Sequence, residues 1–407
     1  MIKDSSSKVK ICFVTTVPFQ VNVFLGKHIL KLVEYADIVI ITNRNDHNIC
    51  ELSPELKGRV RVCCLPFQRP IRPLRDLWSL LKLIHVLYRE RPDIVQSMSP
   101  KAGLICALAG WMLNLPIRVH WFTGQVWVNR QGMARNLLKI LDVLIAKLNT
   151  HLLADSPSQK DFLVQNIVSH KSKIEVLCSG SVCGVDINRF QPNPKCRSTV
   201  RHKYAIPDTA VLGLFVGRVT ADKGVIELAQ ALHILSEQGI NLYFLFVGPD
   251  EGNMAVSIKL AAGNAAKRII LAGYSANPES FMSASDFLVL PSYREGFGST
   301  IIEAASCGVP TIGTRIYGII DAIQEGETGL LVEPRNPEQL ADAMQKLAID
   351  RQYGSKLGSA ARVRVLANFR SEYLTEALAN YYDRLLRMAN RTALFTKDDK
   401  FEGLSDF

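Results

Sequence analysis

Short apolar runs alternate with helical stretches along most of the chain, and this alternation constrains the fold more than any other feature. In the first half the apolar runs are "KICFVTT", "DIVIIT", "DIVQSM", "IRVHWF", "LLADS" and "KIEVLCSG". Helical patterns lie between them, at about residues 23–35, 101–113 and 133–149. Strands separated by helices form parallel sheets with right-handed crossovers. The first half therefore predicts a doubly wound, Rossmann-like α/β domain.

The same alternation starts again in the second half, with "AVLGLFVGR", "INLYFLFVG", "RIILAG", "DFLVLPS" and "PTIGT". A polar stretch, "NRFQPNPKCRSTVRHKYAIPDT", separates the two halves. We therefore expect two Rossmann-like doubly wound domains facing across a cleft, which suits a chain of 407 residues. The expected parts are an N-terminal domain (1–190), a linker (191–209), a C-terminal domain (210–370), a C-terminal helix (371–390) and a flexible tail (391–407). Packing back on the N-terminal domain is one option for that helix.

Cysteine usage and hydropathy favour a cytoplasmic location. The nine cysteines are scattered, without a C-x-x-C pair, as is typical of reduced thiols and not of a disulfide framework or zinc site. The start "MIKDSSSKVKICFVTT" lacks the long apolar core of a signal peptide, so we do not expect secretion. The longest uncharged run, Ala102 to Ile117, has 16 residues, fewer than the roughly 20 that a spanning helix needs.

Positive charge is concentrated in the first half of the chain. Residues 1–200 contain 27 Lys and Arg against 14 Asp and Glu, whereas residues 201–407 contain 21 against 24. Nucleic acid, an anionic membrane surface or an anionic substrate could each account for such asymmetry. We expect no nucleic acid, because the sequence has no zinc finger, basic zipper or aromatic RNA-binding signature.

The stretch 69–91 is both amphipathic and basic. Apolar residues recur there at helical spacing beside a basic stripe: Leu74, Leu77, Trp78, Leu81, Ile84 and Tyr88, with Arg72, Arg75, Lys82 and Arg89. One interpretation is a helix that lies on an anionic membrane. The other is an ordinary domain helix whose apolar stripe packs in the core and whose charges face water.

The stretch "YREGFGSTIIEAASCG" follows a buried strand with a glycine turn and then a short helix, for which Ser299 is the candidate N-cap and Gly308 the end. A strand, a turn and a helix N-terminus in this order favour a phosphate, because free backbone N–H groups and the helix dipole point toward it. Phosphate repels carboxylates, so Glu295 and Glu303 should address hydroxyl-bearing parts of the same ligand, such as sugars. A solvated loop is the ordinary alternative.

A second turn on the same predicted sheet edge carries two cations. The strand "VLGLFVGR" ends in Gly217 and Arg218, and Lys223 follows at the start of the next helix. Both side chains suit phosphate oxygens, although surface charges at a helix start would look the same. Further glycine turns at Gly248 and at Gly273 with Tyr274 lie on this edge, where backbone groups could hold a flat base.

These segments carry a resemblance to a known family. "VGRVTADKG", "FVGPDEG", "EGFGSTIIEAASCGVPTIGT" and "GETGLLVEPRNPEQLADAM" resemble the C-terminal domain of retaining glycosyltransferases of family 4, which have the GT-B fold. "LLADSPSQKDFL" and "GSVCGVDINRFQP" resemble the end of that family's N-terminal domain. The similarity is greatest to the branch that builds bacterial surface polysaccharides, such as capsule, O-antigen and lipopolysaccharide, on lipid carriers.

The resemblance implies that the N-terminal domain (1–190) binds an acceptor and the C-terminal domain (210–370) a donor, and it implies roles for the motif residues. The donor would be a nucleotide diphosphate sugar, for which we expect a UDP-hexose or UDP-N-acetylhexosamine. The acceptor would be a lipid-linked saccharide at the inner face of the plasma membrane. Arg218 and Lys223 would hold the diphosphate, Glu295 the transferred sugar and Glu303 the ribose. The expected donor-binding set also includes Gly217, Gly248, Gly273, Tyr274, Gly296, Phe297, Gly298, Ser299 and Thr300.

Two departures from the family pattern affect the N-terminal domain. "TTVPFQVNVF" stands where many members have a glycine pair after the first strand, which leaves the contact of this domain with the phosphates open. Thr123 and Gly124 stand in the best-matching register for the family's His-Gly, and His120 lies three residues earlier. Either Thr123 or His120 could face the sugar. His120 is a candidate catalytic residue, and a packed core histidine is the alternative.

We expect a reaction that needs neither a metal ion nor another cofactor. The sequence has no Asp-x-Asp motif, so Arg218, Lys223 and the helix N-terminus would stabilise the charge on the leaving phosphate. Rival interpretations are a sugar-nucleotide epimerase or phosphorylase of the same fold, and a non-catalytic nucleotide-sugar-binding subunit. A dinucleotide oxidoreductase fits less well, because no G-x-G-x-x-G follows a strand.

Overall fold

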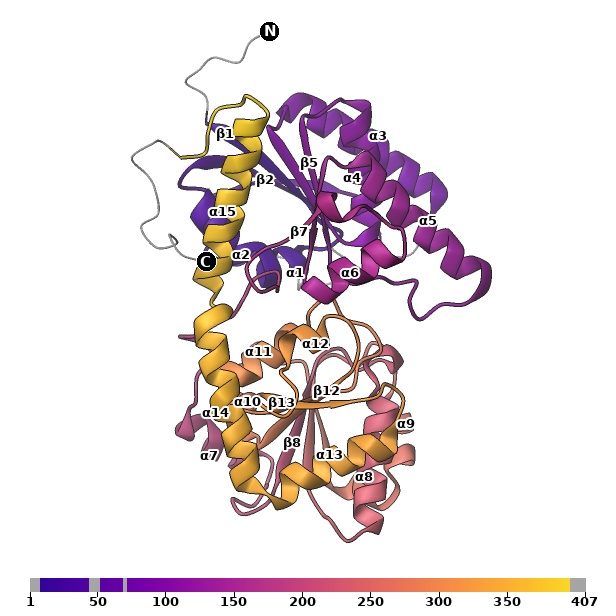
Figure 1. Ribbon diagram of the computed structural model, residues 1–407, viewed down its shortest axis with the longest axis vertical. Helices are drawn as coiled ribbons and strands as arrows, with labels where there is room; N and C mark the ends of the chain where they lie inside the picture. The colour runs from indigo at the N-terminus through magenta and orange to yellow at the C-terminus, as the bar shows by residue number, and fades with distance from the viewer. Residues whose placement is uncertain (1–7, 44–51, 69–71, 396–407) are drawn as a thin grey trace. The chain divides into compact units, whose positions relative to one another are not determined.

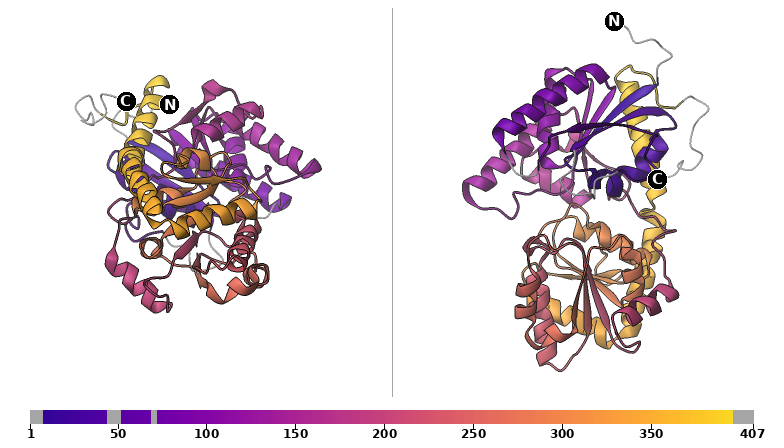
Figure 2. Two further views of the ribbon diagram at one scale, coloured as in Figure 1. Left: turned by 60° about the horizontal axis from the view of Figure 1, so that its bottom comes forward. Right: turned by 180° about the vertical axis from the view of Figure 1, so that it is seen from behind.

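A computed structural model describes residues 8–43, 52–68 and 72–395 and divides the chain into two units. Unit 1 comprises the described residues of Met1–Thr123, Arg130–Cys183 and Ser371–Phe407. Unit 2 comprises Gly124–Asn129 and Gly184–Arg370. Each unit has its own parallel sheet with helices on both faces, as Figures 1 and 2 show. The predicted Rossmann-like architecture of both halves is confirmed.

Unit 1 contains a seven-stranded parallel sheet in the order β3-β2-β1-β4-β5-β6-β7. Its strands are β1 (Val9–Val14), β2 (Ala36–Asn43), β3 (Arg61–Leu65), β4 (Ile94–Met98), β5 (Ile117–Phe122), β6 (His151–Ala154) and β7 (Ile174–Val176). Its helices are α1 (Pro18–Gln20), the π-helix η1 (Val21–Leu25), α2 (Gly26–Leu32), α3 (Pro73–Glu90), α4 (Pro100–Met112), α5 (Gly132–Leu148), α6 (Pro157–Gln165), the 3₁₀ turn η2 (Lys171–Lys173) and α15 (Ser371–Met388). The helix expected at about 23–35 corresponds to α1, η1 and α2, which follow one another without a break from Pro18 to Leu32 and include a π-helical segment.

Successive side chains of the unit 1 strands point to opposite faces of the sheet, and each face packs in its own apolar layer. On β1, Cys12 and Val14 pack with α3 and α4, whereas Ile11 and Phe13 pack with α2 and α15. Figure 1 shows α3, α4 and α5 on one side of this sheet and α15 on the other. Both faces are therefore covered, which explains why the strands are apolar along their whole length.

Buried polar contacts hold α15 in unit 1. The Tyr382 hydroxyl donates to Gln96 Oε1 on β4 at 2.5 Å, and His28 Nδ1 lies 2.9 Å from Thr375 Oγ1. Burial lowers the pKa of His28 to about 4, so its ring is neutral at pH 7. The chain continues beyond α15 in an ordered form, because Leu394 and Phe395 are buried against this core. The flexible tail expected from 391 is therefore wrong for 391–395, and 396–407 lie outside the described residues, as do 69–71 of the basic stretch.

Unit 2 contains a six-stranded parallel sheet in the order β10-β9-β8-β11-β12-β13. Its strands are β8 (Leu212–Val216), β9 (Tyr243–Val247), β10 (Ile269–Gly273), β11 (Phe287–Leu290), β12 (Thr311–Thr314) and β13 (Gly329–Val332). Its helices are α7 (Pro194–Lys203), η3 (Ala221–Lys223), α8 (Val225–Glu237), α9 (Ala255–Ala262), η4 (Gly263–Arg268), α10 (Pro278–Ala284), α11 (Ser299–Ser306), α12 (Ile319–Ala322), α13 (Pro337–Ile349) and α14 (Arg351–Asn368).

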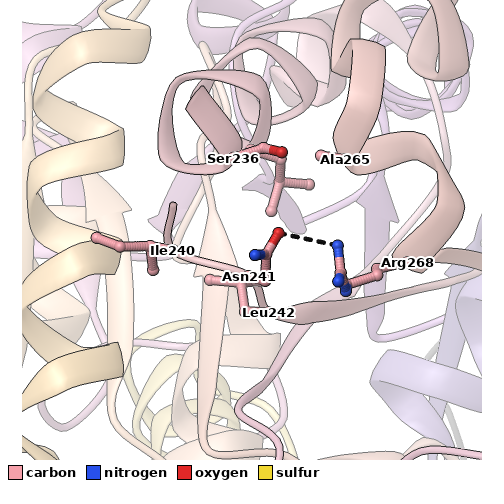
Figure 3. Close-up of a pocket in the computed structure, with 7 residues that line it drawn as sticks. Ser236, Ile240, Asn241, Leu242, Ala265 and Arg268 are labelled. Carbon is pink, nitrogen blue, oxygen red and sulfur yellow. Dashed lines mark hydrogen bonds between the residues drawn. The ribbon is translucent and has the colours of Figure 1, made fainter. Parts of the chain in front are cut away.

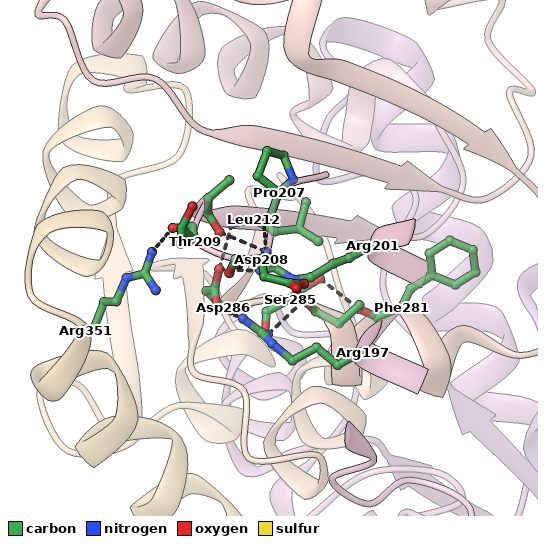
Figure 4. A network of polar contacts seen from close by, with 12 residues as sticks. Arg197, Arg201, Pro207, Asp208, Thr209, Leu212, Phe281, Ser285, Asp286 and Arg351 are labelled. Carbon is green, nitrogen blue, oxygen red and sulfur yellow. Dashed lines mark hydrogen bonds and ion pairs between the residues drawn. The ribbon is translucent and has the colours of Figure 1, made fainter. Parts of the chain in front are cut away.

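The stretch 191–209, expected as a linker, is instead a packed part of unit 2. It forms α7, and an ion pair between the buried Arg201 and the half-buried Asp286 joins this helix to the start of β11 (Figure 4). The Arg201 side chain is 1% exposed, and its Nη2 lies 3.0 Å from Asp286 Oδ2. Arg201 also donates to four backbone carbonyls, those of Ala284, Pro207, Asp208 and Ala210. Two arginines of the polar stretch that suggested a linker, Arg197 and Arg201, thus pair with the half-buried carboxylate of Asp286.

Candidate functional site

The strand order of the unit 2 sheet reverses between β8 and β11. From β8 the chain continues to β9 and β10 on one side, and from β11 it continues to β12 and β13 on the other. In open α/β sheets, ligands bind at such a switch point, beyond the carboxyl ends of the strands. The turns Gly217–Lys223 and Pro291–Gly298 follow β8 and β11 directly. They are joined by a hydrogen bond from Tyr293 N to Asp222 O at 3.0 Å. The site that the sequence predicts on this edge therefore occupies the switch point.

An ion pair joins the two turns at their centre. Lys223 Nζ contacts Glu295 Oε1, and the Ser292 hydroxyl donates to the same oxygen at 2.8 Å. The Lys223 and Glu295 side chains are 16% and 15% exposed, so the pair is largely shielded yet reachable. Two residues that the sequence assigns to adjacent parts of one ligand are thus in direct contact.

Several cations surround Asp222 beside this pair. Burial alone would raise the pKa of Asp222, but the Thr220 hydroxyl at 2.6 Å, Arg294 at 3.4 Å, and the charges of Arg218 and Lys223 together lower it. Arg218 also forms a 3.1 Å pair with Glu251 on the surface, an interaction that contributes about 1 kcal/mol or less. A phosphate could therefore replace Glu251 at little cost.

Close backbone contacts explain the glycines of these turns. A Cβ atom at Gly224, which has a φ of +68°, would lie 2.1 Å from Pro291 O, so only glycine lets η3 approach β11. A Cβ at Gly248 would lie 1.8 Å from Gly217 O. The ends of β8, β9 and β10 are further joined by hydrogen bonds from Gly217 N to Val247 O and from Gly248 N to Gly273 O. Tyr274, next in the chain, is 59% exposed.

The glycine turn after β11 leads into α11 differently from the expectation. Gly298, in the left-handed conformation with a φ of +77°, is the N-cap, so the assignment of Ser299 to that position is wrong. Ser299 and Thr300 are half-buried in the first turn of the helix. Phe297 is 2% exposed and packs against Phe369 at 5.3 Å between ring centroids. Its side chain therefore belongs to the core, and only its backbone could contact a donor.

Glu303 lies on α11, one turn into the helix, and is half-buried. Burial raises its pKa to about 7; the positive charge of Arg189 opposes this shift, whereas the negative charge of Glu279 adds to it. Arg189 is itself paired with Glu279 at 2.9 Å. A carboxyl with this pKa changes its charge near neutral pH, so any ligand that hydrogen-bonds to it should bind in a pH-dependent way.

The residues predicted near the end of β5 separate in the structure. Gly124 belongs to unit 2, where its φ is +102° and a Cβ atom would lie 3.2 Å from Gly296 N. Gly124 therefore lies directly against the turn that carries Glu295. Thr123, at the boundary of unit 1, is half-buried.

His120 lies in the interior of unit 1, with 1% of its surface exposed. A 2.9 Å hydrogen bond joins its Nδ1 to Ser97 Oγ, and its ring packs edge-on against Phe122 and beneath Gly103 of α4. Burial lowers its pKa to about 3, which keeps the ring neutral. These surroundings are those of a packed core histidine, the alternative to a catalytic role.

Sequence reasoning missed three polar residues that shape this site: Ser292, Asp222 and Arg294. Asp222 and Arg294 are adjacent to Lys223 and Glu295, and Ser292 lies three residues before Glu295. The contact between Asp222 and Arg294 depends on the pairing of β8 with β11, which brings together residues 72 positions apart. Only adjacency to a motif could have indicated them.

A small surface pocket of unit 2 lies away from the switch point. Its lining includes Ser236, Asn241 and Arg268, with Arg268 Nη1 donating to Asn241 Oδ1 at 2.8 Å (Figure 3). Asn241 lies two residues before β9 and Arg268 directly before β10, so the pocket lies at the amino ends of these strands, opposite the glycine turns. It therefore has no part in the site.

Across 8–43, 52–68 and 72–395, no group of three or more His, Cys, Asp or Glu residues is arranged to hold a metal ion. Within the same residues, no helix is long and apolar enough to cross a bilayer.

Comparison with known proteins identifies the family. Residues 197–364 match the family model described as "Glycosyl transferases group 1", and residues 33–180 match the "Glycosyl transferase 4-like domain". The capsular polysaccharide biosynthesis glycosyltransferase CapM of Staphylococcus aureus is 32% identical over 326 residues, which cover 79% of this chain and 85% of CapM. UDP-Gal:alpha-D-GlcNAc-diphosphoundecaprenol alpha-1,3-galactosyltransferase of Escherichia coli is 26% identical, with 86% and 90% covered.

Among solved structures, Anabaena Alr3699/HepE in complex with UDP-glucose aligns with a TM-score of 0.76 and 19% identity, covering 92% of this chain and 99% of that one. The fold and its switch-point site thus define a glycosyltransferase with the GT-B fold. The chain belongs to glycosyltransferase family 4, as its sequence motifs indicate.

Proposed function

We propose that the protein is a retaining transferase that moves a hexose or N-acetylhexosamine from a UDP-sugar to a lipid-linked saccharide in bacterial surface polysaccharide synthesis. The observation that carries this proposal is the contact of Lys223 with Glu295 where the turns after β8 and β11 meet. A cation for a phosphate and a carboxylate for a sugar hydroxyl lie side by side there, as the junction between a diphosphate and its sugar requires.

The donor would lie along the switch-point edge of the unit 2 sheet. Arg218 and Lys223 would bind the diphosphate, with backbone N–H groups at the start of α11 adding to them. Glu295 would accept hydrogen bonds from the sugar, and Glu303 from the ribose. The base would lie at the end of β10, against Gly273 and the exposed Tyr274. The UDP-glucose bound to Alr3699/HepE supports the choice of a UDP-linked donor.

The acceptor is inferred from relatives. The Escherichia coli relative acts, by its name, on a sugar carried by diphosphoundecaprenol, and the Staphylococcus aureus relative takes part in capsule synthesis. We therefore assign a lipid-linked saccharide to this protein and place its action at the inner face of the plasma membrane. Thr123 and Gly124 lie on the acceptor side of the donor sugar in this proposal, because Gly124 lies against the Glu295 turn.

The proposed reaction proceeds on one face of the donor sugar. The bond between the anomeric carbon and the β-phosphate oxygen breaks, and its electron pair stays on the phosphate. The acceptor oxygen bonds to the anomeric carbon from that same face, and a donor phosphate oxygen takes its proton. Lys223, Arg218 and the α11 N-terminus stabilise the growing negative charge, so no metal ion is required. Glu295 stabilises the positive charge that develops on the sugar.

A panel of nucleotide sugars tests the donor assignment. A ligand at about 100 times its dissociation constant stabilises a protein by about 2.7 kcal/mol, which is readily detected as a thermal shift. We expect a shift with one UDP-hexose or UDP-N-acetylhexosamine, and sugar transfer to a polyprenyl-diphosphate saccharide with that donor. A shift with GDP-mannose alone would overturn the choice of base. Donor binding without transfer or slow donor hydrolysis would instead indicate a non-catalytic subunit, and isomerised donor an epimerase.

A further inference from the structure

Helix α3 of unit 1 is apolar on two opposite faces. One face packs on the sheet through Ser79, Leu83 and Leu87, which are fully buried. At about 100° per residue, a second apolar stripe lies on the opposite face. Its members are exposed: Leu74 (85%), Leu77 (53%), Trp78 (55%), Leu81 (51%) and Tyr88 (60%). Packing of this stripe in the core, one of the two interpretations of the sequence, is therefore wrong.

The charges of α3 are sorted around this outward stripe. Asp76 and Glu90 lie toward the domain, where Lys101 pairs with Asp76 at 2.8 Å and Arg61 pairs with Glu90 at 2.8 Å. The basic residues Arg75, Lys82 and Arg89 are exposed along one border of the stripe. Lys82 Nζ lies 5.1 Å from the centre of the Trp78 ring. The outer surface of α3 therefore combines apolar side chains with positive charge.

We propose that the outward face of α3 docks this protein on the surface of a bilayer that contains anionic lipid. The helix would lie in the plane of the interface, with its apolar stripe at the boundary of headgroups and acyl chains and its cations on lipid phosphates. A tryptophan and a tyrosine in the stripe suit that boundary, because their rings are amphipathic. This inference rests on the proposed function only in taking a membrane as the place where the acceptor is met.

Charge favours lipid over a protein partner as the occupant. The stripe is bordered by three exposed cations, and the two acids of the helix are already paired within unit 1. An anionic bilayer is complementary to this pattern along the whole helix. A second copy of this chain would instead bring the cations of two α3 helices together.

Tryptophan fluorescence can locate the docking face, because the chain has four tryptophans in distinct places. Trp121 and Trp127 are fully buried, Trp111 is 54% exposed at the end of α4, and Trp78 is in the stripe. With vesicles of phosphatidylcholine that contain about 30% phosphatidylglycerol, we expect the tryptophan emission to shift to the blue. We also expect brominated acyl chains to quench it. Both effects should persist in Trp111→Phe and disappear in Trp78→Phe. The reverse result would overturn the assignment to α3.

Partitioning into the same vesicles tests the two components separately. Replacing Arg75, Lys82 and Arg89 by Gln should weaken binding on the order of 100-fold, because each charge near an anionic surface contributes about 1 kcal/mol. Leu77→Ser with Leu81→Ser should also weaken binding at least tenfold. The matched control is Val256→Ser with Leu260→Ser on α9 of unit 2, where both side chains are similarly exposed, at 68% and 77%. We expect little change in that control.

Three outcomes would overturn the proposal: equal losses in the α3 and α9 variants, equal binding to pure phosphatidylcholine vesicles, or self-association that the α3 variants abolish in the absence of lipid. The vesicles contain neither donor nor acceptor. A protein that ignores them but transfers sugar to a short-chain, water-soluble acceptor would therefore contradict the docking face and leave the proposed function intact. Loss of transfer with normal vesicle binding would have the opposite meaning.

Discussion

The two units share one architecture but place different chemistry on it. In both, the order of a parallel sheet reverses beside the first strand of the unit, between β1 and β4 or between β8 and β11. In unit 2 the turns at this reversal carry Lys223, Glu295 and the cations around Asp222. In unit 1 the corresponding turns carry the hydroxyls of Thr16 and Ser99, whose oxygen atoms are 2.7 Å apart.

This difference shows what the fold determines and what the residues determine. A doubly wound sheet fixes where a ligand can bind, because its strands end at a common edge. The side chains on that edge decide whether the ligand is an anion or a neutral molecule. In unit 2 the charged side chains lie at the switch point of the sheet. In unit 1 the conspicuous charged side chains lie on the outer face of α3, away from the sheet edge.

The largest expected effect on stability concerns how unit 2 is held together. Asp286→Ala would leave Arg201 buried without its carboxylate, so we expect the free energy of unfolding to fall by about 3 kcal/mol. Urea denaturation would measure this loss. The control is Arg315→Gln, which removes exposed pairs with Glu325 and Glu333 and should cost about 1 kcal/mol or less. Equal small effects would mean that α7 is only loosely attached, as a linker would be.

One substitution in each unit tests whether the groups that act in catalysis lie in unit 2 and not in unit 1. Lys223→Gln should lower kcat/KM about 100- to 1000-fold, the range for removing one preorganised group that stabilises transition-state charge. His120→Gln, in the interior of unit 1, should keep activity within about threefold, because a long polar side chain can still reach Ser97. Steady-state kinetics with the identified donor gives both values. Comparable losses would assign chemistry to unit 1 as well.

Because the pKa of Glu303 is raised, we expect donor binding to depend on pH. The Glu303 pKa is raised to about 7 by burial. In the proposed arrangement, only the ionised carboxylate can accept hydrogen bonds from both ribose hydroxyls. Affinity for a UDP-sugar should therefore rise up to tenfold per pH unit below about 7 and level off above it. In the free protein the sign is opposite: the folded state holds the proton more tightly, so the free energy of unfolding should fall as pH rises from about 4.5 to 7. Both slopes should vanish in Glu303→Gln; slopes that persist would assign them to another group.

The smallest expected effect is that of metal removal. If Arg218, Lys223 and the α11 N-terminus replace a metal ion, initial rates in excess EDTA should equal those in its absence. The control adds magnesium or manganese to the chelated enzyme, which should change nothing. A loss of activity that either ion restores would show that the donor phosphates are bound through a cation.

Local patterns predicted most of the secondary structure and the motif residues. The alternation of apolar strands and helices located both sheets, and the glycine turns located the switch point of unit 2. The errors arise where distant residues decide the outcome. The polar stretch before β8 became α7 because Arg201 meets Asp286, which is 85 positions away. Leu394 and Phe395 pack because α15 returns the chain to unit 1.

Helical periodicity also did not determine which face of a helix packs in the core and which faces water. In α3 the more conspicuous apolar stripe faces water, whereas the narrower set around Leu83 packs on the sheet. Likewise, Phe297 lies within the motif predicted to bind the donor, yet it packs in the core against Phe369, a residue that sequence spacing does not connect to it. The motif therefore did not predict which of its side chains are buried.

The two glutamates of unit 2 provide the most direct test of the account, through UDP affinity by calorimetry and turnover by donor consumption in Glu295→Gln and Glu303→Ala. Glu303 is assigned to ribose hydroxyls that stay bound throughout, so Glu303→Ala should weaken UDP roughly 10- to 150-fold, as expected for about 1.5 to 3 kcal/mol. Glu295 is assigned to charge that develops in the transition state, so Glu295→Gln should lower kcat by more than it changes UDP affinity. If Glu295→Gln mainly weakens UDP while Glu303→Ala mainly slows turnover, the proposed arrangement of the donor is wrong.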